Sequence, residues 1–240
     1  MALGVEGVSV VTTTFNEREY VGVFVERVRG ALRGVRHEVV VVDDSSPDGT
    51  YLEAARWADR AVLVRGAGQT GGLAVGLGVA RYPVVVTLDV DLENPPELIP
   101  VLLREFAGRG LDLLVASRAW LPRFSERVAS ATVGRVVGVG DVFSNFRVYR
   151  RGLFAGFRPV LGETFGGELL AYAWARGFRL GELVYEPPPR RARPRIGGRV
   201  RANARILAAT GKLLLYLASQ GAPRARLARV VVRGPWPRLF

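Results

Sequence analysis

The feature that most constrains the fold is an alternation of short apolar runs with segments of helical spacing, which fills the first half of the chain. The runs are apolar at consecutive positions, so both of their faces are expected to be buried. Runs of this kind separated by helices are typical of a mostly parallel sheet with helices on both faces, which places the chain in the α/β class. The expected strands cover residues 8–14, 37–43, 60–64, 83–89 and 112–117, and the expected helices cover 19–33, 50–58, 71–80 and 95–108.

Two of the apolar runs stop at a pair of aspartates. Asp43 and Asp44 end the second expected strand, and Asp89 and Asp91 end the fourth. Ligands of open α/β sheets bind beyond the carboxyl ends of the strands, so four carboxylates can converge on one crevice. Their mutual repulsion is costly unless a cation or hydrogen-bond donors lie nearby. Mg²⁺ or Mn²⁺, which prefer oxygen ligands, is therefore the expected cofactor, and a solvated turn is the alternative interpretation.

The charge of the chain points to anionic partners. The formal net charge is +12, from 34 basic and 22 acidic residues, and Lys212 is the only lysine. Arginine binds phosphate through a planar fork of donors, which indicates nucleotides, anionic lipid or nucleic acid as partners. Genome composition or a hot habitat is an alternative cause of the arginine excess. Residues 190–205 and 223–240 hold seven and five arginines and no acid, which suggests a catalytic front and a basic back.

Several classes of protein are excluded or disfavoured by composition. Cysteine is absent, which excludes disulfides and cysteine metal sites and is compatible with a reducing compartment. The first residues lack the pattern of a signal peptide. The apolar stretch 206–219 contains Lys212 and falls short of the roughly 20 residues that span a bilayer. The single histidine, His37, starts the second expected strand, away from the crevice, so we expect a structural role for it.

A series of motifs resembles a known enzyme family. The sequence is similar to family 2 glycosyltransferases with the GT-A fold, and more closely to dolichol-phosphate mannosyltransferase and related polyprenyl-phosphate sugar synthases. The motifs follow the order that they have in this family. They are VVTTTFNERE (10–19), VVVVDDSSPDGT (39–50), TLDVDLENPPE (87–97), ASR (116–118), GDVFSNFRVYRR (140–151), GGELLAYAWARGFRLGEL (166–183) and RPRIGG (193–198).

The resemblance implies a reaction. A sugar passes with inversion from a nucleotide-sugar, GDP-mannose in the type members, to the phosphate of a polyprenol such as dolichol. A Mg²⁺ or Mn²⁺ ion bridges aspartates and the diphosphate. Another donor such as UDP-glucose, or a soluble saccharide acceptor, is an alternative. A further alternative is a protein without catalytic activity that binds anions or nucleic acid, although no nucleic-acid motif accompanies the arginine runs.

The resemblance also assigns donor-binding residues, position by position. Glu93 stands where the family usually has Gln, Thr13 stands where it has Pro, and Arg195 replaces a lysine. Asp89, Asp91 and Glu93 are the expected metal ligands. The residues expected to bind the nucleotide-sugar are Thr13, Phe15, Glu17, Val42, Asp44, Asp89, Val90, Asp91 and Arg195.

The same comparison of motifs assigns an acceptor site. Arg118, Arg127 and Ser130 are expected to bind the acceptor phosphate, although the spacing around the last two is loose. Asp91, Arg118 and Arg147 are the expected catalytic residues. Asp141, Ser144 and Glu168 fall in the segments that accompany this site in the family. Pro189 occupies a position where the family has Arg, and Arg190 or Arg191 can substitute for it.

The chain is expected to divide into a catalytic domain, residues 1–198, and a basic C-terminal helix and tail, residues 199–240. Residues 199–218 predict an amphipathic helix with arginine on one side and leucine, isoleucine and tyrosine on the other. Such a helix suits an anionic membrane surface, and a helix packed on the core with a solvated basic face is the alternative. We therefore expect a peripheral protein on the cytoplasmic face of the membrane, with the bilayer or a small membrane subunit as partner and no nucleic acid.

Overall fold

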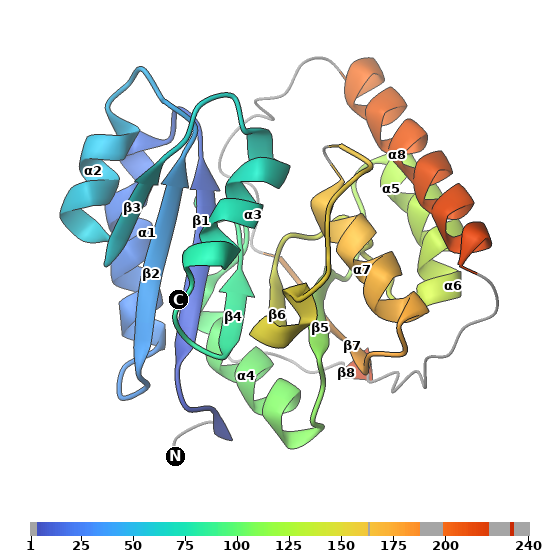
Figure 1. Ribbon diagram of the computed structural model, residues 1–240, viewed down its shortest axis with the longest axis horizontal. Coiled ribbons are helices and arrows are strands. Elements are labelled where there is room, and N and C mark those ends of the chain that lie inside the picture. Colours follow the sequence, from blue (N-terminus) through green and yellow to red (C-terminus); the bar gives the residue numbers. More distant parts are fainter. Residues whose placement is uncertain (1–3, 163, 188–198, 221–230, 233–240) are drawn as a thin grey trace.

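The structure of the chain is a computed structural model that describes residues 4–162, 164–187, 199–220 and 231–232. Within these residues an eight-stranded sheet forms the centre of the molecule, with helices on either side (Figure 1). The strands lie across the sheet in the order β3-β2-β1-β4-β6-β5-β7-β8. They are β1 (Val8–Thr14), β2 (His37–Asp43), β3 (Arg60–Leu63), β4 (Val84–Thr87), β5 (Leu113–Arg118), β6 (Arg147–Arg150), β7 (Leu180–Tyr185) and β8 (Val231–Val232).

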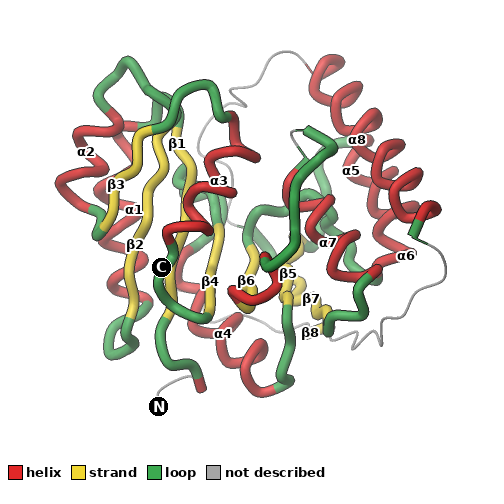
Figure 2. The backbone as a smooth tube through the Cα atoms, viewed as in Figure 1, coloured by secondary structure: helices red, strands yellow, loops and turns green. Residues whose placement is uncertain are grey.

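Helices connect the strands of the first half in the alternation that the sequence predicts (Figure 2). Every strand and helix expected before residue 118 is present, with its ends within a few residues of the predicted ones. The α-helices are α1 (Arg18–Ala31), α2 (Thr50–Trp57), α3 (Gly68–Val79), α4 (Ile99–Gly108), α5 (Phe124–Ala129), α6 (Arg135–Val137), α7 (Phe165–Ala175) and α8 (Arg199–Ser219). Shorter turns of helix are η2 (Pro96–Leu98), η3 (Ser130–Gly134) and η4 (Arg151–Phe154).

The sheet is mostly parallel, as expected, and β6 is the exception among the described strands. β6 lies between β4 and β5 and pairs antiparallel with both. Its register pairs Thr87 with Arg147, so the residues that follow β4 lie beside those that precede β6. This pairing brings the segment before Arg147 to the end of the sheet where Asp89 and Asp91, the expected metal ligands, lie.

Both faces of the sheet are buried, which explains why the strands are apolar at consecutive positions. In β2, Val39 and Val41 pack into a cluster with α1, α2 and α4. The alternate residues Val40 and Val42 pack into a second cluster with α3 and α7. Side chains of a strand point alternately to its two faces, so each face supplies one of the two clusters.

Glycines let α3 lie close against the sheet. A Cβ atom added to Gly76 would lie 2.4 Å from Cγ1 of Val11, and one added to Gly72 would lie 2.8 Å from Cγ2 of Thr13. Real Cβ atoms do not approach other atoms this closely, so these two positions require glycine. The glycine-rich sequence of α3 is therefore a packing feature, and it brings the first turn of α3 close to the carboxyl ends of β1 and β2.

Helices α5 and α8 lie together at one side of the molecule (Figure 1). The hydroxyl of Ser125 in α5 donates a hydrogen bond to Oδ1 of Asn203 in α8, at 2.7 Å. α8 buries Ala209, Leu213 and Leu217 against the protein, so one of its faces belongs to the core, as in the alternative interpretation above. Among the described helices, none has the length and apolarity to cross a membrane.

Candidate functional site

The loops that follow β1, β2 and β4 share an unusual backbone conformation. Asn16, Ser45 and Leu92 have φ angles of 58°, 57° and 62°, and they are the three described residues other than glycine with positive φ. This left-handed conformation is unfavourable for a branched residue such as leucine, and strain of this kind clusters at functional sites. The three residues lie at the carboxyl ends of neighbouring parallel strands, where ligands of open α/β sheets bind.

Asp89 is held by two amide side chains from distant elements. Its Oδ1 atom accepts hydrogen bonds from Nδ2 of Asn145 at 3.0 Å and from Nε2 of Gln69 at 3.2 Å. Burial and the neighbouring charge of Asp91 raise the pKa of Asp89 to about 6, while the bond from Asn145 acts in the opposite direction. The carboxylate of Asp89 thus lies in a place that disfavours its charge, and a bound cation would offset this cost.

Asp91 is positioned by the strained turn after it. Its Oδ1 atom accepts a hydrogen bond from the backbone amide of Glu93 at 3.0 Å, across Leu92. Asp89, Asp91 and Glu93 are close enough for the two latter charges to raise the pKa of Asp89. Two or three carboxylates fit a hard divalent cation. In the described part of the chain, however, no three acidic, histidine or cysteine side chains converge closely enough to hold a metal ion.

The other pair of aspartates is committed to hydrogen bonds within the protein. Asp43 is buried and accepts from Oγ1 of Thr14 at 3.0 Å and from the amide of Ser46 at 2.9 Å. The two oxygens of Asp44 accept from the amides of Ala67 and Gly68, both at 3.0 Å, and so hold the start of α3. This pair of aspartates is therefore stabilised by hydrogen-bond donors of the protein, which is one of the two kinds of compensation expected for carboxylates at the strand ends.

The remaining residues expected to bind the donor differ in exposure. Phe15 is 57% exposed at the end of β1, while Thr13 and Glu17 are half-buried nearby. Val42 and Val90 are buried, with their side chains in the two core clusters, so only their main-chain atoms can meet a ligand. Arg195 lies outside the described residues, as do Pro189, Arg190 and Arg191.

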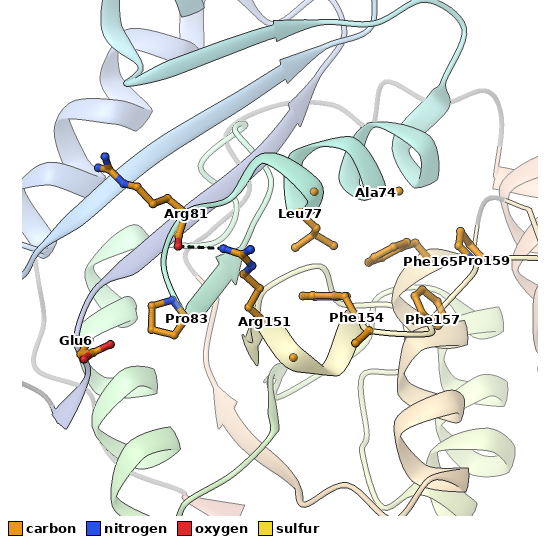
Figure 3. Close-up of a pocket in the computed structure, with 13 residues that line it drawn as sticks. Glu6, Ala74, Leu77, Arg81, Pro83, Arg151, Phe154, Phe157, Pro159 and Phe165 are labelled. Carbon is orange, nitrogen blue, oxygen red and sulfur yellow. Dashed lines mark hydrogen bonds between the residues drawn. The ribbon is translucent and has the colours of Figure 1, made fainter.

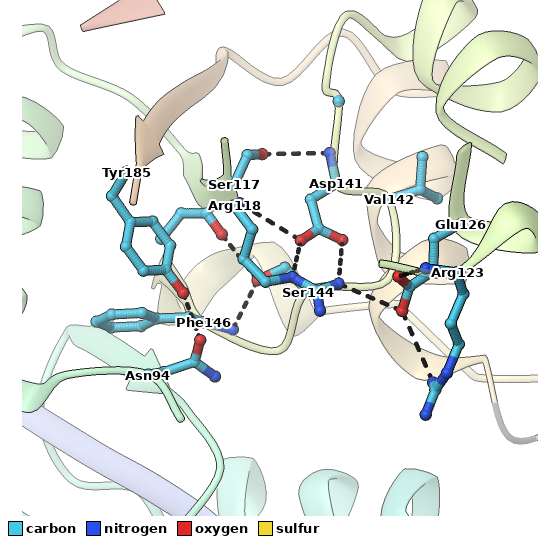
Figure 4. Close-up of polar contacts among 12 residues, drawn as sticks. Asn94, Ser117, Arg118, Arg123, Glu126, Asp141, Val142, Ser144, Phe146 and Tyr185 are labelled. Carbon is cyan, nitrogen blue, oxygen red and sulfur yellow. Dashed lines mark hydrogen bonds and ion pairs between the residues drawn. The ribbon is translucent and has the colours of Figure 1, made fainter. Parts of the chain in front are cut away.

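Arg118 is the centre of an ion-pair network (Figure 4). Its Nε atom donates to Oδ2 of Asp141 at 2.7 Å, and Nη2 donates to Oδ1 of the same residue at 3.2 Å and to Oε1 of Glu126 at 3.4 Å. Burial lowers the pKa of Arg118, but its hydrogen bond to Asp141 and the charges of Asp141 and Glu126 raise the pKa by more, so the guanidinium stays charged. Arg118 is the last residue of β5, and two carboxylates already occupy much of its hydrogen-bonding capacity.

Arg147 has a structural position, in contrast to its expected catalytic role. Its side chain is fully buried, and its guanidinium donates to the carbonyl oxygens of Val142 at 2.6 Å, Ser144 at 2.6 Å and Gly166. Since these donors face backbone, Arg147 fastens the segment before β6 to the start of α7. Glu168 has a similar function, because its two oxygens accept from the amides of Val160 and Leu161.

Two residues expected at the acceptor phosphate lie on the helix after Arg118. Arg127 is exposed on α5, and Ser130 is half-buried at the start of η3. Ser144 is buried and donates from its hydroxyl to the carbonyl oxygen of Ala116 at 2.8 Å. Arg127 is thus free of the burial that restricts Arg147, and Ser144 belongs to the framework.

Tyr185 lies near both groups of charged residues. Its hydroxyl donates a hydrogen bond to Oδ1 of Asn94 (Figure 4). Burial raises the pKa of Tyr185, and the charges of Asp141, Asp89 and Glu93 raise it further, while that of Arg118 lowers it. The aspartates after β4 and the network around Arg118 therefore lie near one another.

The sequence model of the Glycosyl transferase family 2 matches residues 9–156, which is more than half of the chain and includes the segments that follow β1, β2, β4 and β5. The chain belongs to glycosyl transferase family 2. The expected family is therefore confirmed.

Curated relatives carry names that refer to polyprenyl phosphates. The chain is 32% identical over 197 residues to dodecaprenyl-phosphate galacturonate synthase of Rhizobium johnstonii, an alignment that covers 73% of this chain and 57% of the relative. It is 36% identical over 116 residues to dolichol-phosphate mannosyltransferase of Pyrococcus furiosus, covering 46% of this chain and 33% of the relative. This family 2 chain thus aligns with little more than half the length of the first relative and a third of the second.

Solved structures confirm the GT-A fold. Glucosyl-3-phosphoglycerate synthase of Mycobacterium tuberculosis, solved with Mn²⁺, uridine diphosphate and phosphoglyceric acid, superimposes with a TM-score of 0.69. The superposition covers 91% of this chain and 80% of that chain, at 22% sequence identity. At this identity the likeness concerns the fold of the family 2 chain alone.

Sequence reasoning did not identify Gln69, Asn145 or Tyr185 as part of the site of this glycosyltransferase-family chain. Asn145 and Gln69 reach Asp89 from sequence distances of 56 and 20 residues, through the antiparallel pairing of β6 and the close approach of α3. The only sequence signal for Asn145 is its place inside GDVFSNFRVYRR. An amide side chain directly before a strand is a weak signal without the register of that strand.

A hollow in the family 2 chain lies away from these carboxylates. It has a volume of about 720 Å³ and opens between α3 and the segment after β6, beside Leu77, Phe154 and Phe157 (Figure 3). Arg151 lies at its edge and donates from Nη1 to the carbonyl oxygens of Ala80 and Arg81. Pro83, which precedes β4, also lines it, so this hollow reaches the opposite end of β4 from Asp89.

Proposed function

We propose that this chain is the catalytic unit of a metal-dependent glycosyltransferase that moves a sugar from a nucleotide-sugar to a polyprenyl phosphate. The observation that carries the proposal is the pair Asp89 and Asp91 after β4. Asp89 has a pKa raised to about 6 and is held by Asn145 and Gln69. A metal ion bound there would supply charge neutralisation for the departing nucleoside diphosphate. Mg²⁺ and Mn²⁺ both suit these oxygen ligands.

The names of the relatives support a polyprenyl phosphate as the acceptor. One relative is named for galacturonate and dodecaprenyl phosphate, the other for mannose and dolichol phosphate. The sugar differs between them, so the two names together support the acceptor and not one particular donor. GDP-mannose remains our first choice of donor, with uridine diphosphate sugars as the alternative. Uridine diphosphate and Mn²⁺ occur in the structure of the phosphoglycerate enzyme, which shares the fold.

The proposed reaction is a single displacement at the anomeric carbon. The bond from this carbon to the acceptor phosphate oxygen forms while its bond to the diphosphate oxygen breaks. A phosphate monoester is already anionic near neutral pH, so the reaction needs positive charge to hold it more than a strong base. Arg127 is the exposed cation on α5 that is available for this contact, and Arg118 holds Asp141 and Glu126 in place beside it.

Donor binding is the first property to test. We expect nucleotide with Mn²⁺ to raise the melting temperature of the protein by about 5 to 10 °C at a ligand concentration near one hundred times Kd. The panel is GDP, UDP, GDP-mannose, UDP-glucose and UDP-galacturonate, each with and without Mn²⁺. The Asp91→Ala variant should lose the Mn²⁺-dependent part of the shift. The Glu26→Ala variant, which removes an exposed carboxylate from α1, is the matched control and should keep it.

The acceptor is tested with the donor that this panel identifies. We expect transfer of radiolabelled sugar to a polyprenyl phosphate, measured in the organic phase, and no transfer to 3-phosphoglycerate. Transfer to 3-phosphoglycerate alone would replace the proposed acceptor by a soluble one. Absence of any nucleotide shift in the thermal experiment would contradict the proposed function as a whole.

A further inference from the structure

The outer surface of α5 and α8 carries exposed apolar and basic side chains that do not contribute to the core. On α8, Leu207, Leu214 and Leu215 are 40%, 36% and 75% exposed. On α5, Phe124 is 62% exposed. We call the surface made by these four residues, with the exposed Arg127 and Arg135, the α5–α8 face.

The exposed leucines are not part of the face that α8 buries. Leu213 and Leu217 point into the core cluster with α7, and Leu214 and Leu215 lie around the helix from them. A surface helix of a globular protein normally has charged and polar residues opposite its buried stripe. α8 instead has apolar residues on both sides, which indicates that its outer side meets another apolar environment.

The charge of this face has one sign. Residues 119–140 contain a single acid, Glu126, and it is buried and bound to Arg118 and Arg123. The sequence of α8 contains no acid at all. Arg127 on α5, Arg135 on α6 and Lys212 on α8 are exposed cations. Apolar side chains flanked by cations, without an exposed acid, match the surface of a bilayer that contains anionic lipid.

The α5–α8 face is continuous with the proposed acceptor site. Glu126 in the first turn of α5 is bound to Arg118 at the end of β5, and Ser125 beside it is bound to Asn203 of α8. The two helices lie together at one side of the molecule (Figure 1). A surface on which this side rests would therefore lie next to the network around Arg118.

We propose that the α5–α8 face rests on an anionic lipid bilayer, with its leucines and Phe124 at the boundary of head groups and acyl chains. The proposal extends the proposed function, because a polyprenyl phosphate acceptor is itself held in a bilayer. Docking through this face brings the crevice to the membrane surface, so that the acceptor phosphate reaches Arg127 while its chain stays in lipid. The opposite edge of the sheet, at β3 and α2, faces water.

Vesicle flotation of the purified chain tests the proposal without any acceptor or donor. The chain is mixed with vesicles of phosphatidylcholine, with or without phosphatidylglycerol. We expect binding to the anionic vesicles that weakens as salt is raised, because exposed charges are screened. The variant with Leu207→Gln, Leu214→Gln and Leu215→Gln should bind the anionic vesicles at least roughly tenfold more weakly, since it loses most of the apolar surface of this face.

Matched controls separate docking from folding and from the proposed function. Leu52 on α2 is 68% exposed, so Leu52→Gln makes the same change on another surface and should leave vesicle binding unchanged. The triple variant should keep the melting temperature of the wild type and its shift with nucleotide and Mn²⁺. Vesicle binding without a nucleotide shift would support the face and contradict the proposed function, and the reverse result would do the opposite.

Two results would overturn the proposal. One is a wild-type chain that does not float with anionic vesicles, or a triple variant that floats as well as the wild type. The other is a wild-type dimer that becomes a monomer in the triple variant by light scattering, with vesicle binding unaffected. In that case the face is an interface between copies of the chain.

Discussion

The carboxylate of Asp89 is partly buried and has the acidic neighbour Asp91. This environment is unfavourable for a negative charge when no cation is bound. The pKa of Asp89 is raised from its ordinary value of 3.8 to about 6, first by burial and then by Asp91. The folded protein therefore binds the proton of this residue more tightly than the unfolded chain does. Stability from this residue is fully present below about pH 4 and declines as the pH rises through about 6.

The variant Asp89→Asn should consequently be more stable than the wild type near neutral pH. A shift of two pKa units corresponds to about 3 kcal/mol, and partial exposure reduces the expected gain to about 1 to 2 kcal/mol. Near pH 4 the two proteins should unfold at similar denaturant concentrations. The same variant should lose the thermal shift with nucleotide and Mn²⁺. A variant that is less stable than the wild type near neutral pH would show that the Asp89 charge is well accommodated.

Asn145 should affect metal binding through the position of Asp89. Replacement by alanine removes the hydrogen bond of 3.0 Å to Oδ1 of Asp89. Loss of a partner of a metal ligand typically weakens metal affinity by roughly tenfold to a hundredfold. We expect Asn145→Ala to weaken Mn²⁺ binding by about tenfold, measured by electron paramagnetic resonance of free Mn²⁺ in the presence of nucleotide. Asn203→Ala, the same change on α8, should have no effect on this titration.

At the scale of elements, the close contact between α3 and β1 makes a paired prediction. Gly76→Ala places a Cβ atom 2.4 Å from Val11, so the helix or the strand must move. Overpacking of this kind costs about 1 to 3 kcal/mol. Gly78 lies in the same helix with no atom within 4 Å of an added Cβ, so Gly78→Ala should stabilise the protein by up to about 1 kcal/mol. Urea denaturation of both variants measures the difference, and equal effects would contradict the close approach.

The local elements of the first half follow from the sequence because each is specified by neighbouring residues. Apolar runs, the proline at the start of α4 and the glycine at its end predict strands and helices that the structure contains. The second half was less predictable, since β6 is placed by pairing with β4 and β5 from opposite directions. The neighbours of Asp89 depend on this pairing, which no local pattern reveals.

Residue types at the crevice were predictable, but their partners were not. Asp44 follows β2 as expected, yet its oxygens hold amides 23 and 24 residues later in the chain. Arg147 fits a family motif, yet it is buried and donates to backbone carbonyls. A motif identifies which residue of a segment the family keeps. The burial of that residue in the folded chain decides whether its side chain can reach a ligand. The donor and acceptor assignments for these positions therefore stay predictions.

The whole molecule places its two sets of candidate residues in different parts of the sheet. Residues expected to bind the donor follow β1, β2 and β4, and those expected to bind the acceptor follow β5. We expect Arg127→Gln to raise the KM for polyprenyl phosphate roughly fivefold to tenfold, because it removes one charge-assisted contact at an exposed site. The Kd for nucleotide, measured by calorimetry, should not change. Arg104→Gln removes the same charge from the exposed side of α4 and should leave both constants unchanged.

The chain contains no cysteine and one lysine, and that lysine is exposed on α8 beside the α5–α8 face. An amine-reactive fluorophore will therefore label Lys212 and the N-terminal amine alone. These two amines are far apart in the sequence, because Lys212 is on α8 and the N-terminal amine precedes β1. Because the chain has no cysteine of its own, a single cysteine introduced elsewhere, for example at Leu52, would be the only target of thiol reagents. One introduced cysteine would thus allow an amine label and a thiol label in the same protein, for measuring distance and orientation.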